Sequence, residues 1–174
     1  MRDSQNGLNL KSIDDIRANG FEGFVCVRDL QRLKCCDVPN EPGVYLVLSA
    51  GTKSPEFIAR STGGHFKGKD PTAPIDDLQR KWVKGALILN VGKAGAPGKE
   101  ATLRSRLSSY MGFGQGKRQG HCGGRYIWQL KDVGDLLVCW KRTSKATARE
   151  TEIDLIREFE RQHNGRLPFA NLCH

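Results

Sequence analysis

The residues from Leu87 to Met111 read LILNVGKAGAPGKEATLRSRLSSYM, and this stretch decides the fold. Its apolar beginning predicts a short buried strand. A glycine-rich turn with Lys93 at its mouth follows, and a predicted helix then begins at Leu103. Arg106 and Tyr110 are four residues apart in this helix, so both side chains lie on one helix face.

Two more strands and a second long helix are predicted on either side of this stretch. A β-branched and aromatic run follows the turn at Pro42-Gly43 and ends at Leu48. A third buried strand is predicted from Leu136 to Trp140. An amphipathic pattern begins at a Thr143 or Ser144 cap and stops at Asn164-Gly165, which predicts the last helix.

Length and charge limit the possible organisation and partners. The chain has 174 residues, enough for one domain with a real core but too few for two ordinary domains. Its 28 Lys and Arg residues outnumber 19 Asp and Glu residues, which gives a net charge of +9. This excess favours a polyanionic partner, and a merely basic soluble surface is the alternative.

The six cysteines are expected to be free thiols, because no secretory signal opens the chain and a reducing compartment is therefore favoured. Neither Cys35-Cys36 nor His121-Cys122 has the spacing of a structural zinc site. No apolar run approaches the length of a membrane span. We therefore expect a soluble, cytoplasmic protein with no membrane partner.

Two segments have no chemical motif of their own. Residues 1–40 are expected to form an N-terminal extension packed on the domain of residues 41–174, or a DNA-facing accessory element. A long polar segment covers about residues 50–85. Connections of this length are more often functional or disordered, so this segment is either a DNA-contacting insertion or a solvated hairpin loop.

Five separated pieces of the chain resemble, in order, motifs of the GIY-YIG nuclease superfamily. They match its first signature, its second signature, its arginine helix, its acidic helix and its terminal asparagine. The pieces are Gly43-Val44-Tyr45, Asn90-Val91-Gly92-Lys93, the helix from Leu103 to Tyr110, Glu152 with Leu155-Ile156, and Asn171. Asn90 departs from the second signature, which normally begins with tyrosine.

The resemblance implies an α/β (α+β) fold, in which a small, largely antiparallel sheet of three strands is flanked by helices. It implies a metal-dependent DNA endonuclease that hydrolyses a phosphodiester bond, of the restriction or repair type. One alternative is a catalytically impaired nucleic-acid-binding protein with the same fold. Another is a structural or partner-binding protein whose apparent motif is core packing. The sequence does not decide between DNA and RNA, nor does it fix the oligomeric state.

The resemblance also assigns roles on the two helices. Glu152 is the expected ligand of one Mg²⁺ or Mn²⁺ ion, with Glu150 as the rival carboxylate. Arg106 offers a bidentate guanidinium to the scissile phosphate. Tyr110 is expected to orient the phosphate or the attacking water, or else to be a half-buried aromatic residue.

Tyr45 is the expected general base. A tyrosine has a reference pKa of about 10, so nearby positive charge must favour its phenolate. We expect Lys93 to supply that charge if the two signature strands pair as in the family. Asn90 cannot act as a base, so any catalytic duty of the missing tyrosine is lost or moved. Without the resemblance, Tyr45 is a core aromatic of its strand.

The remaining expectations concern support and DNA contact. Supporting positions are Gly43, Asn90, Gly92 and Asn171, the last by hydrogen-bonding backbone around the site. Basic residues expected to contact DNA are Lys67, Lys69, Arg104, Lys117 and Arg118. The hydrolytic hypothesis requires that four side chains converge on one phosphate-sized hollow, namely Tyr45, Lys93, Arg106 and Glu152.

Overall fold

A computed structural model describes residues 8–49, 51, 53–119 and 123–172. These residues form a mixed α/β fold around one antiparallel sheet in the order β1-β4-β2-β3. The strands are β1 (Glu22–Cys26), β2 (Gly43–Leu48), β3 (Ile88–Ala94) and β4 (Leu137–Arg142). The helices are α1 (Ile13–Ala18), α2 (Val27–Arg32), α3 (Ile75–Lys81), α4 (Leu103–Gly114) and α5 (Ala148–Gln162), with 3-10 turns η1 (Arg125–Gln129) and η2 (Val133–Asp135).

The expectation of three strands was wrong, because β1 adds a fourth. This strand comes from the N-terminal arm and pairs with β4, Glu22 opposite Trp140. Its register shifts between Gly23 and Val25, and both Gly23 and Phe24 have positive φ. Such a bulge breaks the alternation of inward and outward side chains. The strand therefore has no continuous period-two pattern, and from the sequence the apolar run Phe24-Val25-Cys26-Val27 indicates only a short strand or turn.

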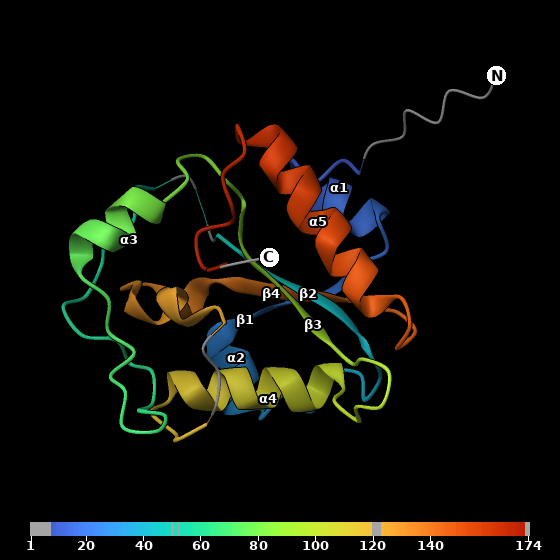
Figure 1. The fold of residues 1–174 in the computed structure, drawn as a ribbon, viewed down its shortest axis with the longest axis horizontal. Coiled ribbons are helices and arrows are strands. Elements are labelled where there is room, and N and C mark those ends of the chain that lie inside the picture. Colours follow the sequence, from blue (N-terminus) through green and yellow to red (C-terminus); the bar gives the residue numbers. More distant parts are fainter. Residues whose placement is uncertain (1–7, 50, 52, 120–122, 173–174) are drawn as a thin grey trace.

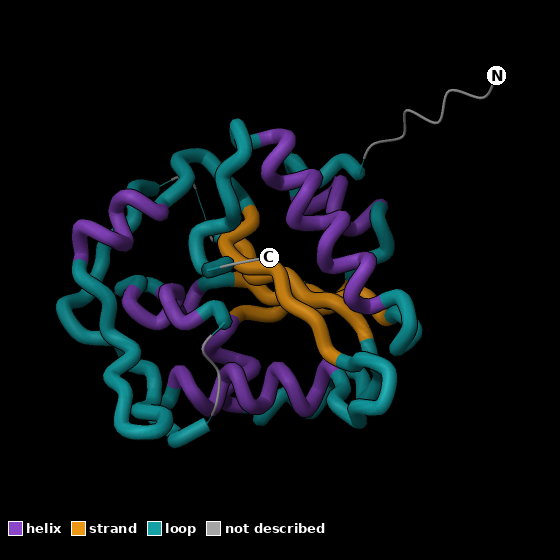
Figure 2. The backbone as a smooth tube through the Cα atoms, viewed as in Figure 1, coloured by secondary structure: helices purple, strands orange, loops and turns teal. Residues whose placement is uncertain are grey.

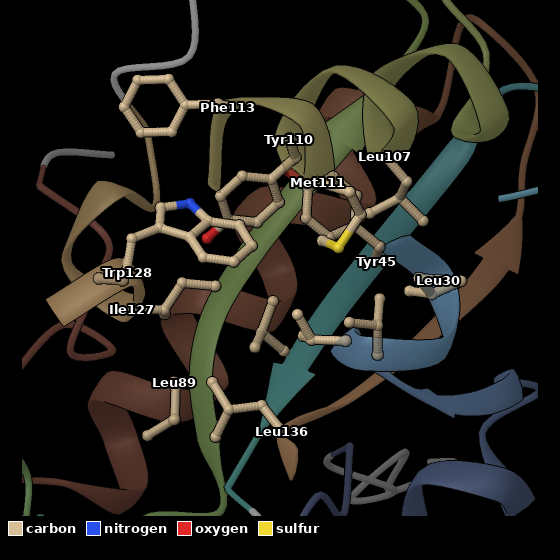
Figure 3. Packing of buried hydrophobic residues seen from close by; sticks show 14 of the residues in the cluster. Leu30, Tyr45, Leu89, Leu107, Tyr110, Met111, Phe113, Ile127, Trp128 and Leu136 are labelled. Atoms are coloured by element: carbon tan, nitrogen blue, oxygen red, sulfur yellow. The ribbon is translucent and has the colours of Figure 1, made fainter. Parts of the chain in front are cut away.

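The sheet lies between two helical layers, with α4 and α2 on one face and α5 and α1 on the other (Figure 1). All six residues of the central strand β2 are buried. Because side chains alternate along a strand, Tyr45 and Val47 enter the core beneath α4, and Val44, Leu46 and Leu48 enter the core beneath α5. Figure 3 shows part of the first of these cores.

The two long helices begin and end for local reasons. Thr102 and Ser105 form a capping box at the start of α4. The start of α5 differs from the predicted cap, because Ser144 to Thr147 first form a turn and Thr147 is the N-cap. Asn164 and Gly165 then adopt left-handed φ after the helix, as its predicted stop.

The segment between β2 and β3 is packed, rather than a simple polar loop, where the structure describes it. It contains α3 and long connections on one side of the molecule (Figure 2). The buried amide of Gln129 accepts from Ala73 N–H at 2.7 Å and donates to Ala73 C=O at 3.0 Å. Phe57 and Trp82 pack against Phe169.

None of the helices described here has both the length and the apolar character needed to span a bilayer.

Candidate active site

Four side chains from four different elements line one hollow at the edge strand β3. These are Tyr45 from β2, Lys93 from β3, Arg106 from α4 and Glu152 from α5. The hollow has a volume of about 460 Å³. Because β3 is the outer strand of the sheet, side chains from both faces reach this edge.

The pairing of β2 with β3 decides which side chains share a face. Tyr45 is opposite Gly92, and Val44 is opposite Lys93. Paired residues point to the same side of a sheet, so Lys93 lies on the α5 side with Val44, whereas Tyr45 lies on the α4 side. A Cβ atom added to Gly92 would overlap the phenol of Tyr45. The absence of a side chain at Gly92 thus lets the Tyr45 hydroxyl lie over β3 and reach the hollow.

Lys93 and Glu152 form an ion pair across the α5 side of the hollow. Lys93 Nζ lies 2.5 Å from Glu152 Oε2. The side chain of Lys93 is 32% exposed and that of Glu152 is 17% exposed, so water partly screens the attraction between their charges. This pair holds the carboxylate at the hollow and balances its charge.

Arg106, and not Lys93, is the cation that acts on Tyr45. Burial raises the pKa of the Tyr45 phenol above its ordinary value. The Arg106 guanidinium beside it opposes this pKa shift, and the Glu152 carboxylate adds to it. The expectation that Lys93 lowers the pKa of Tyr45 was therefore wrong, because strand alternation directs Lys93 to the opposite face and into the pair with Glu152.

Arg106 retains hydrogen-bonding capacity at the hollow. Its Nε is buried and has no hydrogen-bond partner within the described part of the chain. Buried donors in native proteins are almost always paired, so an acceptor supplied from outside is a natural partner here. A phosphate oxygen has this chemistry.

Tyr110 lies behind the hollow rather than on its wall. Its ring is fully buried, 6.1 Å from the Tyr45 ring and edge-on to Trp128 at 5.3 Å. Its hydroxyl donates to the Gly124 carbonyl at 2.6 Å. Tyr110 therefore holds the backbone at Gly124, which does line the hollow.

Asn171 replaces a missing strand neighbour at the free edge of β3. Its Oδ1 accepts from Val91 N–H at 2.8 Å, and its Nδ2 donates to Val91 C=O at 2.9 Å. These are the bonds that an adjacent strand would otherwise make.

Gly43 is tightly enclosed at the other side of β2, where an added Cβ would overlap the Lys141 carbonyl.

Replacement of Asn171 by alanine is expected to destabilise the protein by about 2 kcal/mol, because two buried backbone groups of Val91 lose their partners. The midpoint of urea unfolding measures this loss. Asn171→Asp keeps the acceptor but places a carboxylate against the Val91 carbonyl, so it is expected to be no better than alanine. A change below about 0.5 kcal/mol for Asn171→Ala, the range of ordinary surface substitutions, would contradict this role.

The basic residues predicted to contact DNA fall into two groups. Arg104 is near the start of α4, where its Nε donates to the Val38 carbonyl at 2.8 Å. The exposed remainder belong to two loops that meet at the opposite end of α4, where Gly64 N–H donates to Phe113 C=O at 2.8 Å. That second group comprises Lys67, Lys69, Lys117 and Arg118. The structure does not bring the two groups together.

Lys99 is a cation of the hollow that the sequence analysis did not identify. It lies in a turn closed by a bridge to Ala96, between β3 and α4, and its exposed side chain lines the hollow. Its neighbour Glu100 pairs instead with Lys145 at 3.1 Å. No motif contains Lys99. Only its position in the connection between the two motif elements could have indicated from the sequence that it lies at the hollow.

Among the described residues, Glu152 is the only carboxylate that lines the hollow. No cluster of three or more His, Cys, Asp or Glu side chains occurs in residues 8–49, 51, 53–119 and 123–172. Mg²⁺ tolerates such a poor protein site, because it retains several waters and often takes one or two carboxylates together with substrate phosphate. The hard oxygens of Glu152 suit Mg²⁺ or Mn²⁺ in this way.

The side chains that line the hollow belong to elements far apart in the sequence. Its walls combine a phenol, an ammonium, a guanidinium and a carboxylate within one concave site. No family model, curated protein or solved structure matches the chain.

Proposed function

We propose that this protein is a divalent-metal-dependent DNA endonuclease of the GIY-YIG type, acting in restriction or repair. The observation that supports this most is the common hollow of Tyr45, Lys93, Arg106 and Glu152. Hydrolysis of a phosphodiester needs a base for water, positive charge at the phosphate and stabilisation of the leaving oxygen. The four groups supply the protein's share of each requirement.

In this mechanism Arg106 binds the scissile phosphate. Its guanidinium is always charged and its donors form a planar fork that matches two phosphate oxygens. Negative charge on these oxygens increases in the transition state, so the bonds strengthen as the reaction proceeds. The buried Nε of Arg106, unpaired within the described chain, supports this role.

Tyr45 is the proposed acceptor of the water proton. As a phenolate, its oxygen would take one proton while the water oxygen bonds to phosphorus and the P–O bond to the leaving oxygen breaks. Arg106 favours that phenolate, although burial still keeps the pKa of Tyr45 raised. Lys93 holds Glu152 in place, and a cation at Glu152 would stabilise the leaving oxygen.

The proposal is tested by incubating the protein with supercoiled plasmid and Mg²⁺ or Mn²⁺. Nicked circles are expected with metal and none after addition of EDTA. A Glu152→Gln preparation purified in parallel controls for contaminating nucleases. Absence of nicking under all metal conditions would refute the enzymatic proposal.

A second candidate is a catalytically impaired nucleic-acid-binding protein. Two observations favour it, namely asparagine at position 90 in place of a tyrosine and the raised pKa of the Tyr45 phenol. This candidate predicts binding to the plasmid that weakens steeply with salt, without nicking. If the protein neither binds nor nicks the plasmid, both candidate functions are refuted and only a basic globular protein remains.

The rate of nicking is expected to rise about tenfold per pH unit between about pH 6 and pH 9. The pKa of Tyr45 lies above its ordinary value, so the phenolate fraction is small and still increasing throughout this range. Single-turnover rates at saturating metal measure the slope. A plateau near neutral pH, or the same slope in Tyr45→Phe, would exclude Tyr45 as the base.

A further inference from the structure

Asn90 lines the same hollow from β3. The residue is only 3% exposed. Asn90 pairs with Val47, which belongs to the core beneath α4, so its side chain is on the face of Tyr45 and Arg106. Within the described residues, no hydrogen bond is made by this amide.

The neighbours of Asn90 are arranged around it rather than bonded to it. A Cβ added to Gly124 would lie 2.9 Å from Asn90 Nδ2, so the amide packs against bare backbone. The nearby Tyr110 hydroxyl donates to the Gly124 carbonyl and holds that backbone in place. The polar end of Asn90 is thus fixed at the hollow by packing.

We propose that Asn90 is a substrate-contacting residue, whose Nδ2–H donates to a non-bridging oxygen of the phosphate bound by Arg106. This inference rests on the proposed function. Asn90 and Arg106 both line this hollow, and Arg106 Nε is a buried donor with no partner in the described chain. A phosphate oxygen accepts several hydrogen bonds at once, so one ligand satisfies both. Asn90 thereby supplies a second hydrogen-bond donor to the phosphate, beside Arg106.

The proposal is tested by titrating the ¹⁵N-asparagine-labelled protein with inorganic phosphate and following side-chain amide resonances. The Asn90 amide resonance is expected to shift saturably, whereas that of Asn164, beyond the end of α5, is expected to stay unchanged. Asn90→Leu is expected to weaken phosphate binding about tenfold or more, as for loss of a hydrogen bond to a charged group. Asn90→Asp keeps the shape but adds a negative charge, so it is expected to weaken binding further.

Thermal unfolding separates this role from a structural one. Because Asn90→Leu breaks no hydrogen bond within the described residues and adds apolar volume to a residue that is only 3% exposed, its unfolding midpoint is expected to stay equal or to rise. Phosphate binding without a shift at Asn90, unchanged affinity in Asn90→Leu, lower stability of that variant, or no phosphate binding at all would overturn the inference. If wild-type protein nicks the plasmid but gives any of these results, only the role of Asn90 is refuted. If the Asn90 resonance responds to phosphate but the protein does not nick the plasmid, only the nuclease proposal is refuted.

Discussion

Glu152→Gln is expected to lower the rate of plasmid nicking about 10³-fold. The glutamine amide has nearly the same shape but lacks the charge that a divalent cation requires. It also leaves the ammonium of Lys93 without its partner at 2.5 Å. The rate is measured as conversion of supercoiled to nicked plasmid in single turnover at saturating Mg²⁺.

Glu150→Gln is the matched control on the same helix. Glu150 is exposed, two residues before Glu152, and does not line the hollow. Its substitution is expected to leave the rate unchanged within about twofold. Glu152→Gln is expected to cost no more than about 1 kcal/mol of stability, because partly exposed ion pairs contribute little. Equal rates for both variants would remove Glu152 from the proposed chemistry.

The sequence predicted elements that carry their own local signal. The apolar run before Gly92 and the capped pattern from Leu103 predicted β3 and α4, because buried strands and amphipathic helices have distinct periods. The bulged β1 has no such period, and its pairing with β4 is a long-range contact. The apolar run from Phe24 to Val27 is typical of a short strand or turn, but only this long-range pairing makes it a strand of the sheet.

The candidate site was predictable as a set of residues but not as a set of contacts. Its members follow from the motif resemblance, whereas the partner of each side chain depends on the register between β2 and β3. Tyr45 opposite Gly92 requires that Lys93 point to the other face. A shift of one residue would have placed Lys93 beside Tyr45, as expected from the sequence. Arg106 acts on Tyr45 through tertiary packing of α4, which has no local signature.

Gly92→Ala is expected to destabilise the protein by about 3 kcal/mol and to abolish nicking. The added methyl group would overlap the phenol ring and hydroxyl of Tyr45. Tyr45 has little room to move, because its ring lies in the core with Tyr110, Leu107 and Met111 (Figure 3). Overpacking of this kind costs typically about 1–3 kcal/mol, sometimes more. A shift of about 1 Å at a reacting group can cost a further 10²-fold in rate.

Gly123→Ala is the matched control for this effect. Gly123 also lines the hollow, but an added Cβ there meets no described atom within 4 Å and its φ is not positive. Its stability and nicking rate are therefore expected to stay close to wild type. Urea unfolding and the plasmid assay measure both glycine variants in parallel. If Gly92→Ala matched Gly123→Ala in both measurements, the Tyr45 hydroxyl would not occupy the place over β3 from which it is proposed to act.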